Sequence, residues 1–120
     1  MKSRYSDATS FITKDGSLIR ELMHPNTHSC TSLSLAEAII DVASETILHK
    51  HLNTEEIYHI ISGCGRLTLG NEQVDVITGD TVCIPANTPH RICNTGDNPL
   101  AILCCCSPAY SDEDTELLDD

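Results

Sequence analysis

Apolar and polar residues alternate along this chain in short runs, and turn-forming residues separate the runs. The runs cover residues 11–13, 17–22, 31–40, 46–52, 55–61, 66–70, 72–79, 81–85, 89–94 and 99–106. Such alternation is typical of β-strands with one buried face. Gly70-Asn71 between two of these runs is a strong hairpin signal. The pattern predicts an all-β domain of about eight to ten short strands.

Residues 33–43 are the one stretch that also fits a helix, but their β-branched end and the alternation before them favour a strand. An open sheet of this size would leave exposed edges that invite aggregation. The sequence therefore predicts a closed or double-sheet architecture. A sandwich, a jelly roll and a lipocalin-like barrel all fit at this point.

Charge and composition exclude some partners. The chain has 120 residues, with 7 basic and 18 acidic side chains and a net charge of -11. This balance argues against binding to nucleic acid and to an anionic membrane surface. The first ten residues lack the apolar segment of a signal peptide, and the longest apolar run, residues 100–106, is too short to span a bilayer. We therefore expect a cytoplasmic protein whose seven cysteines are reduced thiols.

The acidic residues concentrate at one end. Residues 111–120 carry six carboxylates and no base. We expect residues 1–110 to form a single domain and residues 111–120 to be a solvated, frayed acidic tail.

Three histidines and a carboxylate are candidate metal ligands. His49 and His51 are two residues apart on a predicted strand, so both imidazoles project from the same face, together with Ile47. After a short turn, Glu56 opens the next strand, which we expect to fold back beside the first. His90 follows another turn, residues 85–89. Three imidazoles and one carboxylate leave open positions on an octahedral ion, which is typical of a catalytic site.

These residues carry a resemblance to the cupin family. The spacing H-x-H-x4-E-x6-G over residues 49–63 matches the first cupin motif. Residues 79–94, GDTVCIPANTPHRICN, match the second. Asn87 stands where the family usually has Gly, and Asn also tolerates a left-handed backbone. Ala43 stands at another position where the family commonly has Gly. With its flanking strands, the resemblance covers about residues 15–107.

The resemblance implies a double-stranded β-helix, the cupin or jelly-roll barrel, with a metal in its mouth. It implies His49, His51, Glu56 and His90 as ligands of a divalent transition metal, with Mn, Fe, Co, Ni, Cu and Zn all open. Glu55 is the alternative carboxylate. We prefer Glu56, because its spacing to Gly63 fits the motif and its parity groups it with inward residues.

The resemblance also implies a homodimer, in which residues 11–24 extend the sheet of the partner. Two functions stay open. The first is a metal-dependent enzyme on a small polar metabolite, of isomerase, oxygenase, decarboxylase or lyase type. The second is a non-catalytic module that binds a metal or a small molecule. In a third interpretation, the histidines are a vestigial site on a scaffold.

Other side chains have weaker claims to a role. Tyr58 shares the inward face with Glu56 and is a candidate hydrogen-bond donor to a ligand. Among the consecutive cysteines, parity places Cys104 and Cys106 on one face and Cys105 on the other. We interpret them as small apolar fillers, with a redox-sensitive thiol beside the cavity as the alternative. The remaining basic side chains are expected to be solvated, structural or on the surface: His24, His28, His59, Arg66 and Arg91.

Overall fold

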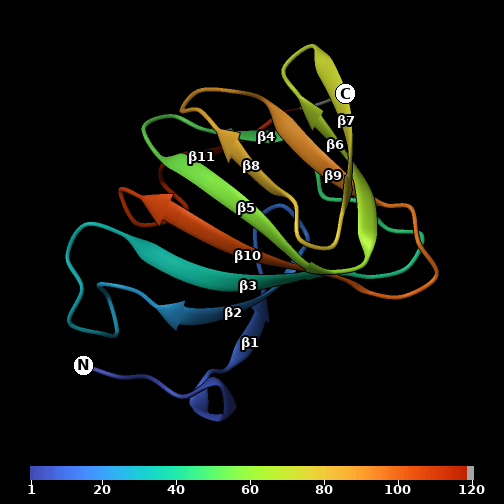
Figure 1. The fold of residues 1–120 in the computed structure, drawn as a ribbon. Helices are drawn as coiled ribbons and strands as arrows, with labels where there is room; N and C mark the ends of the chain where they lie inside the picture. The colour runs from blue at the N-terminus through green and yellow to red at the C-terminus, as the bar shows by residue number, and fades with distance from the viewer. Residues whose placement is uncertain (119–120) are drawn as a thin grey trace.

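Two antiparallel sheets make up the computed structural model, which describes residues 1–118 (Figure 1). One sheet has six strands in the order β1-β2-β3-β10-β5-β8. These are Ser10–Ile12 (β1), Leu18–Met23 (β2), Ser34–Ile40 (β3), Leu100–Ser107 (β10), Glu55–Ser62 (β5) and Thr81–Ile84 (β8). The other sheet has five strands in the order β11-β4-β9-β6-β7. These are Thr115–Leu117 (β11), His49–His51 (β4), His90–Asn94 (β9), Cys64–Leu69 (β6) and Glu72–Ile77 (β7).

The predicted all-β fold is confirmed, and the core explains why it forms. Inward residues of both sheets form one buried cluster, so each sheet covers the apolar face of the other. Its largest side chains are fully buried Leu, Ile and Val residues, among them Ile60 and Ile102 in one sheet and Leu67 and Ile92 in the other. The only helical element in the described residues is a short 3-10 turn, Tyr5–Asp7. Residues 1–118 contain no helix with the length and apolarity needed to cross a membrane.

The structure corrects the expected neighbour of β5. We expected β5 to fold back beside β4, but β4 pairs with β9 and β11, whereas β5 pairs with β10 and β8 in the other sheet. The turn at residues 52–54 therefore carries the chain from one sheet to the other. As a consequence, Glu56 approaches the histidines from the opposite wall of the barrel.

The predicted strand over residues 46–52 is shorter in the structure. Only His49–His51 form β4, and Ile47 is exposed rather than sharing the buried face of the histidines. The reason is that the backbone N–H of Ile47 donates to the carbonyl of Asp15 in the β1–β2 turn, 2.8 Å away. This contact ties the β1–β2 turn to the start of β4.

The acidic end differs from the expected solvated tail. Thr115–Leu117 form β11, which pairs with β4, and Thr115 is buried. Asp114 accepts hydrogen bonds from the backbone N–H groups of Asn53 and Thr54, each at 2.9 Å, and so holds the turn between β4 and β5. The last two residues of the predicted tail lie outside the described residues.

Within the single chain, β1 and β2 extend the chain's own sheet, because β2 pairs with β3 and β1 pairs with β2. The exchange of residues 11–24 between subunits stays a prediction.

The turn before β9 places His90. Asn87 has φ 63° there, so this position does require the left-handed backbone for which the family usually uses Gly. The backbone N–H of Asn87 donates to the carbonyl of His51, 2.6 Å away. The turn is thereby fixed to β4, next to which His90 begins its strand.

Candidate metal centre

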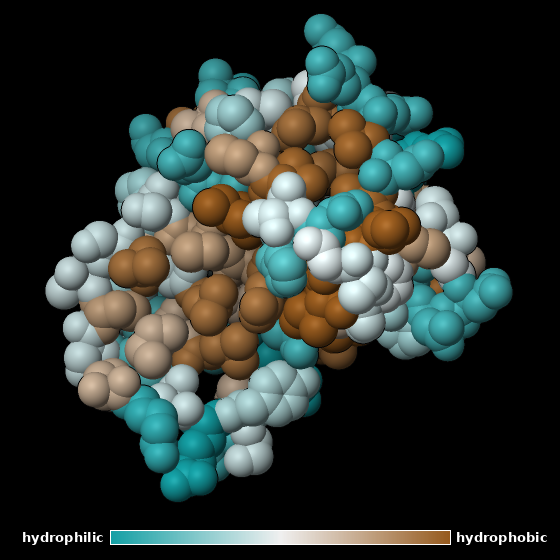
Figure 2. Space-filling model, viewed as in Figure 1, coloured by the Kyte–Doolittle hydropathy of each residue, from teal (hydrophilic) through white to brown (hydrophobic). Residues whose placement is uncertain are grey.

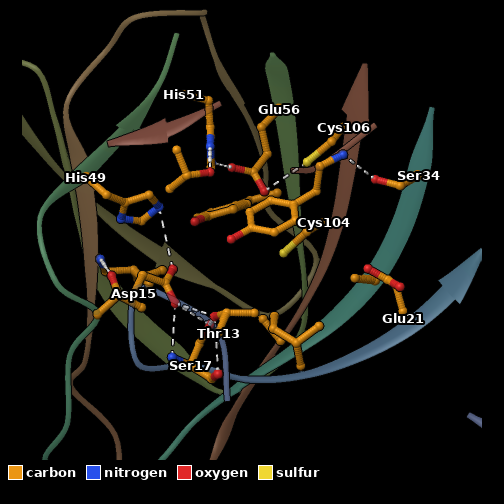
Figure 3. Close-up of a pocket in the computed structure, with 18 of the residues that line it drawn as sticks. Thr13, Asp15, Ser17, Glu21, Ser34, His49, His51, Glu56, Cys104 and Cys106 are labelled. Carbon is orange, nitrogen blue, oxygen red and sulfur yellow. Dashed lines mark hydrogen bonds and ion pairs between the residues drawn. The ribbon is translucent and has the colours of Figure 1, made fainter. Parts of the chain in front are cut away.

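Three buried histidines converge at the end of the barrel where β4 meets β9. His49 lies directly opposite His90 in the β4–β9 pair, and His51 follows two residues later on the same face. The exposed fraction is 2% for His49, 4% for His51 and 0% for His90. One ring nitrogen from each lies within 4.8 Å of the others. The structure therefore brings together the three imidazoles that the sequence singled out, two of which, His49 and His51, are seen in Figure 3.

The hydrogen-bond partners of Nδ1 in His49 and His90 show that this nitrogen carries a hydrogen in both rings. Nδ1 of His49 lies 2.7 Å from the carbonyl of Ile47, and Nδ1 of His90 lies 2.9 Å from that of Thr88. Because a carbonyl only accepts, both Nδ1 atoms carry a hydrogen. In the neutral form of each ring, Nε2 is therefore the nitrogen that has the free lone pair.

In His51 the hydrogen on Nδ1 is held by the side chain of Thr115 instead of by a backbone carbonyl. Its Nδ1 lies 2.9 Å from Oγ1 of Thr115, and that hydroxyl donates its hydrogen to the carbonyl of Ser111, 2.9 Å away. The hydroxyl therefore accepts from His51, and in the neutral form of this ring Nε2 has the free lone pair. Polar groups that orient a ring from behind are typical of histidines that bind metals.

Glu56 closes the cluster from the facing sheet. Its Oε1 lies 3.2 Å from Nε2 of His51 and 3.6 Å from Nε2 of His90. The thiol of Cys106 donates to its other oxygen, Oε2, at 3.4 Å. Glu55, the alternative carboxylate, is exposed. Of the two, the structure brings Glu56 to the histidines.

Asp15 is a second carboxylate at the cluster, and sequence reasoning missed it. Its Oδ2 lies 3.5 Å from Nε2 of His49. Its Oδ1 accepts hydrogen bonds from the hydroxyls of Thr13 and Ser17 and from the backbone N–H of Ser17, at 2.6 to 3.0 Å. In the sequence, Asp15-Gly16 is an ordinary turn signal. Hydroxyl residues on both sides of Asp15 were the one hint that its carboxylate is held in place.

The chemistry of this cluster fits a cation. Oε1 of Glu56 and Nε2 of His90 are buried and have no hydrogen-bond partner within the described residues. A neutral imidazole lone pair beside a carboxylate oxygen offers no hydrogen bond, so these atoms stay unsatisfied unless a positive charge lies between them. Imidazole nitrogens and carboxylate oxygens together suit divalent transition metals.

Burial and charge act against each other on two of these groups. Burial raises the pKa of Glu56, but hydrogen bonds and charge from His51 and His90 in their protonated forms outweigh burial and hold the pKa at about 2. Burial, and then the neighbouring His90, lower the pKa of His49 below 6.5, although Asp15 opposes this. Both shifts favour a carboxylate and a neutral imidazole near neutral pH, the forms in which these groups bind metal ions.

A pocket opens from the cluster into the barrel, with about 650 Å³ of empty space, part of it open to solvent. Tyr58 and Tyr110 line it; their ring centroids lie 6.1 Å from that of His90 and 5.7 Å from that of His51, respectively. Burial raises the pKa of both phenols, so each keeps its hydrogen at neutral pH. Tyr58 is thus a donor at the cavity, as the sequence suggested, whereas Tyr110 was not foreseen.

Two of the consecutive cysteines border the same pocket. Cys104 and Cys106 are buried and line it, while Cys105 is half-buried on the other face, in agreement with the parity of the strand. Burial first, and then the charge of Glu56, raise the pKa of both buried thiols. Because their pKa values are raised, Cys104 and Cys106 contain little reactive thiolate. This favours the interpretation that they are small apolar fillers over the interpretation that one of them is a redox-sensitive group.

Alkylation of the native protein tests this interpretation. Iodoacetamide at pH 8 should label the exposed Cys83 and leave Cys104 and Cys106 unmodified until the protein is unfolded, because both buried thiols are inaccessible and keep their hydrogens. Raised pKa values also mean that any labelling of the buried pair increases as the pH rises. Mass spectrometry of peptides measures the extent at each site. Rapid native labelling of Cys104 or Cys106 would support the redox alternative.

The structure corrects one group of expected surface residues. We expected His24 and His28 to be solvated, but His24 is buried. Its Nδ1 accepts from the backbone N–H of Asn26 at 3.1 Å, and its Nε2 donates to the carbonyl of Tyr110 at 2.7 Å. Nδ1 of His28 accepts from the backbone N–H of His24 at 3.0 Å. Both therefore organise the loop after β2.

The other basic side chains lie away from the pocket. His59 contacts Thr81, with 2.8 Å between Nδ1 and Oγ1, on the outer face of the six-stranded sheet. Arg66 is exposed and pairs with Asp75. Arg91 is half-buried, with its guanidinium 4.0 Å from a carboxylate oxygen of Glu45.

Comparison with known proteins agrees with this architecture. The family model for the cupin domain matches residues 37–106, and the chain belongs to the cupin family. It is 55% identical, over 99% of its length and 95% of the relative's, to "Uncharacterized protein MJ1618" of Methanocaldococcus jannaschii. The resemblance inferred from the two motifs is thereby confirmed.

Two solved structures show the same fold at low sequence identity. One, from Thermotoga maritima, is a predicted oxalate decarboxylase that is 24% identical to this chain, with a TM-score of 0.78 over 90% of this chain and 99% of the other. The other is Streptomyces PAC13 with uridine, 17% identical, with a TM-score of 0.79 over 98% of this chain and 90% of the other. A further PAC13 structure describes that protein as a nucleoside dehydratase, with a TM-score of 0.78 and 18% identity.

Proposed function

We propose that this cupin holds a divalent transition metal through His49, His51, Glu56 and His90, and that it is an enzyme acting on a small polar metabolite. The observation that carries the proposal is the pair of buried atoms without partners, Oε1 of Glu56, which lines the pocket, and Nε2 of His90, 3.6 Å from it. Leaving such groups unsatisfied costs about 1–3 kcal/mol each, and a bound ion would remove that cost.

A bound ion supplies Lewis-acid chemistry, which polarises an oxygen of a substrate. The chain's own groups prepare the site for it. The carbonyls behind His49 and His90 and the hydroxyl of Thr115 behind His51 keep three Nε2 lone pairs directed inward. The thiol of Cys106 holds Oε2 of Glu56, which leaves Oε1 facing the histidines.

Other residues are placed to handle the substrate. Tyr58 lies within the barrel with a hydroxyl that keeps its hydrogen, and it is a candidate to donate to a substrate oxygen. Asp15 offers a carboxylate oxygen on the other side of His49. A donor and an acceptor that line the same pocket could move a proton in isomerase, lyase, decarboxylase or oxygenase chemistry. That two proteins of the same fold are described as a decarboxylase and a dehydratase supports an enzyme rather than a scaffold.

The alternative function is a non-catalytic module that binds a metal or a small molecule, since the same buried donors would also serve storage or sensing. Turnover separates the two functions. Protein purified without a histidine tag and reconstituted with Mn, Fe, Co, Ni, Cu or Zn should convert at least one member of a panel of polar metabolites or consume oxygen. Stoichiometric metal without turnover across the panel would favour the module, and absence of metal uptake would favour a vestigial site.

We also propose a homodimer in the cytoplasm. Apolar side chains gather on the outer face of the six-stranded sheet, where Ile57 and Ile61 are 43% and 40% exposed (Figure 2). A patch of this kind supports association of two copies. All seven cysteines are free, which agrees with a reducing compartment. Light scattering for the mass and cell fractionation for the location test these two proposals, and a monomeric mass or an extracytoplasmic fraction would contradict them.

A further inference from the structure

The charged side chains that line the pocket are all acidic. They are Asp15 in the β1–β2 turn, Glu21 on β2 and Glu56 on β5 (Figure 3). Among the lining residues, all of which belong to the described part of the chain, none is a lysine or an arginine. A pocket that recognises a carboxylate or a phosphate normally presents such a cation.

The basic residues nearest in sequence are engaged elsewhere. The ammonium of Lys14, next to Asp15, donates to the carbonyls of Asp112 and Thr115 at 3.1 and 2.7 Å. Arg20, next to Glu21, lies 4.8 Å from the ring centroid of Tyr5 and 3.6 Å from Oε1 of Glu37. Neither side chain lines the pocket.

A metal ion alone does not make this pocket attractive to anions. Because imidazole binds a metal in its neutral form, a divalent ion held with Glu56 would keep one net positive charge. The carboxylate of Asp15, whose Oδ2 lies 3.5 Å from Nε2 of His49, offsets that charge. Glu21 adds a further negative charge at the pocket wall. Glu56 is buried, and Asp15 and Glu21 are half-buried, so water screens their charges only in part. The net charge of -11 repels an approaching anion in addition.

Asp15 also offers one unused acceptor. Its Oδ1 already receives the hydrogen bonds from Thr13 and Ser17, so it is saturated. Its Oδ2 lies 3.5 Å from Nε2 of His49, which donates nothing to it when that ring is neutral with its hydrogen on Nδ1. A ligand that brings a hydroxyl or an N–H group to this oxygen would satisfy it, whereas an anion would be repelled.

We propose, on the basis of the proposed metal site, that the substrate is an uncharged molecule bearing hydrogen-bond donors, and that Asp15 determines this specificity. Anionic metabolites such as dicarboxylates and sugar phosphates are excluded, which leaves isomerase, lyase and oxygenase chemistry among the reactions named above and removes decarboxylation of such anions. Asp15 acts as an acceptor for the ligand and as an electrostatic barrier to anions.

Cobalt-loaded protein tests the proposal with two simple probes. Azide is an anion, imidazole is neutral and bears an N–H group, and both change the visible spectrum of a protein-bound cobalt ion when they bind it. We expect wild-type protein to bind imidazole more tightly than azide. In Asp15→Asn, the ratio of azide affinity to imidazole affinity should rise by about tenfold or more, because one negative charge next to the ion is removed.

The matched control is Asp75→Asn, which makes the same change of charge on β7 away from the pocket and should shift the ratio less than about twofold, since exposed charges are screened. An unchanged ratio in Asp15→Asn, or an equal shift in Asp75→Asn, would overturn the proposal. Loss of cobalt in Asp15→Asn would also overturn it, because Asp15 would then be a ligand. Failure of the wild type to bind cobalt contradicts the proposed function instead, and it is visible before either probe is added.

Discussion

Protein carrying His90→Ala is expected to retain less than about a tenth of the metal bound by wild type under the same loading conditions. His90 is completely buried, and its Nε2 is one of the two atoms left without a partner. Its removal leaves two imidazoles on β4 and a carboxylate on the facing wall, with a hole in place of the third nitrogen. Elemental analysis of untagged protein after equilibration with manganese or cobalt measures the effect.

His59→Ala is the control for this experiment. It also removes one imidazole from a β-strand, but His59 lies on the outer face of the six-stranded sheet beside Thr81. It should bind as much metal as the wild type. Circular dichroism should show folded β protein for both variants, although His90→Ala should lose the added stability that metal gives the wild type. Full metal content in folded His90→Ala would refute the ligand set.

Thr115→Val should weaken metal affinity by about 10–100-fold, although Thr115 is not itself a proposed ligand. The hydroxyl of Thr115 is the acceptor that fixes the hydrogen of His51 on Nδ1, and both side chains are buried. Valine has nearly the same shape but accepts nothing, so His51 would keep a buried donor without a partner. We also expect a loss of about 1–3 kcal/mol in the free energy of unfolding for this reason.

Thr115→Ser separates the hydroxyl from the packing. Serine keeps the acceptor and removes only a methyl group, so it should restore most of the metal affinity. Competition with a chelator measures affinity in the three proteins, and urea unfolding of the metal-free forms measures stability. If valine and serine weaken metal binding equally, the role assigned to the hydroxyl is wrong.

Much of the fold was predictable, because the alternation of apolar and polar residues indicates which side chains of each strand are buried in the core. The expected runs for β5, β8, β9 and β10 match the observed strands to within one or two residues. Alternate side chains are buried along β9, most of β10 and the first part of β5, whereas β8 buries Ile84 and only partly buries Val82. The same parity correctly separated Glu56 from Glu55. Ala43 and Asn87, which stand where the family often has Gly, both have positive φ, at 59° and 63°. The left-handed backbone conformation is therefore present at both positions, although neither residue is the glycine that the family often has there.

The missed features depend on contacts between distant segments. The segment that contains β11 is mostly acidic, so no apolar alternation marked it as a strand. Its pairing with β4 depends instead on backbone hydrogen bonds and on one buried threonine. Asp15 reaches His49 because the β1–β2 turn is held against the start of β4, 32 residues later, by a backbone hydrogen bond from Ile47 to Asp15. Local patterns carry no information about such pairings.

The position of β11 has a consequence for the order in which the centre matures during translation. His49, His51, Glu56 and His90 all leave the ribosome before Thr115 does. A nascent chain that ends before β11 would hold all four proposed ligands, yet it would lack the hydroxyl that orients His51. Tight capture of a metal ion should therefore await the emergence of β11 and its pairing with β4.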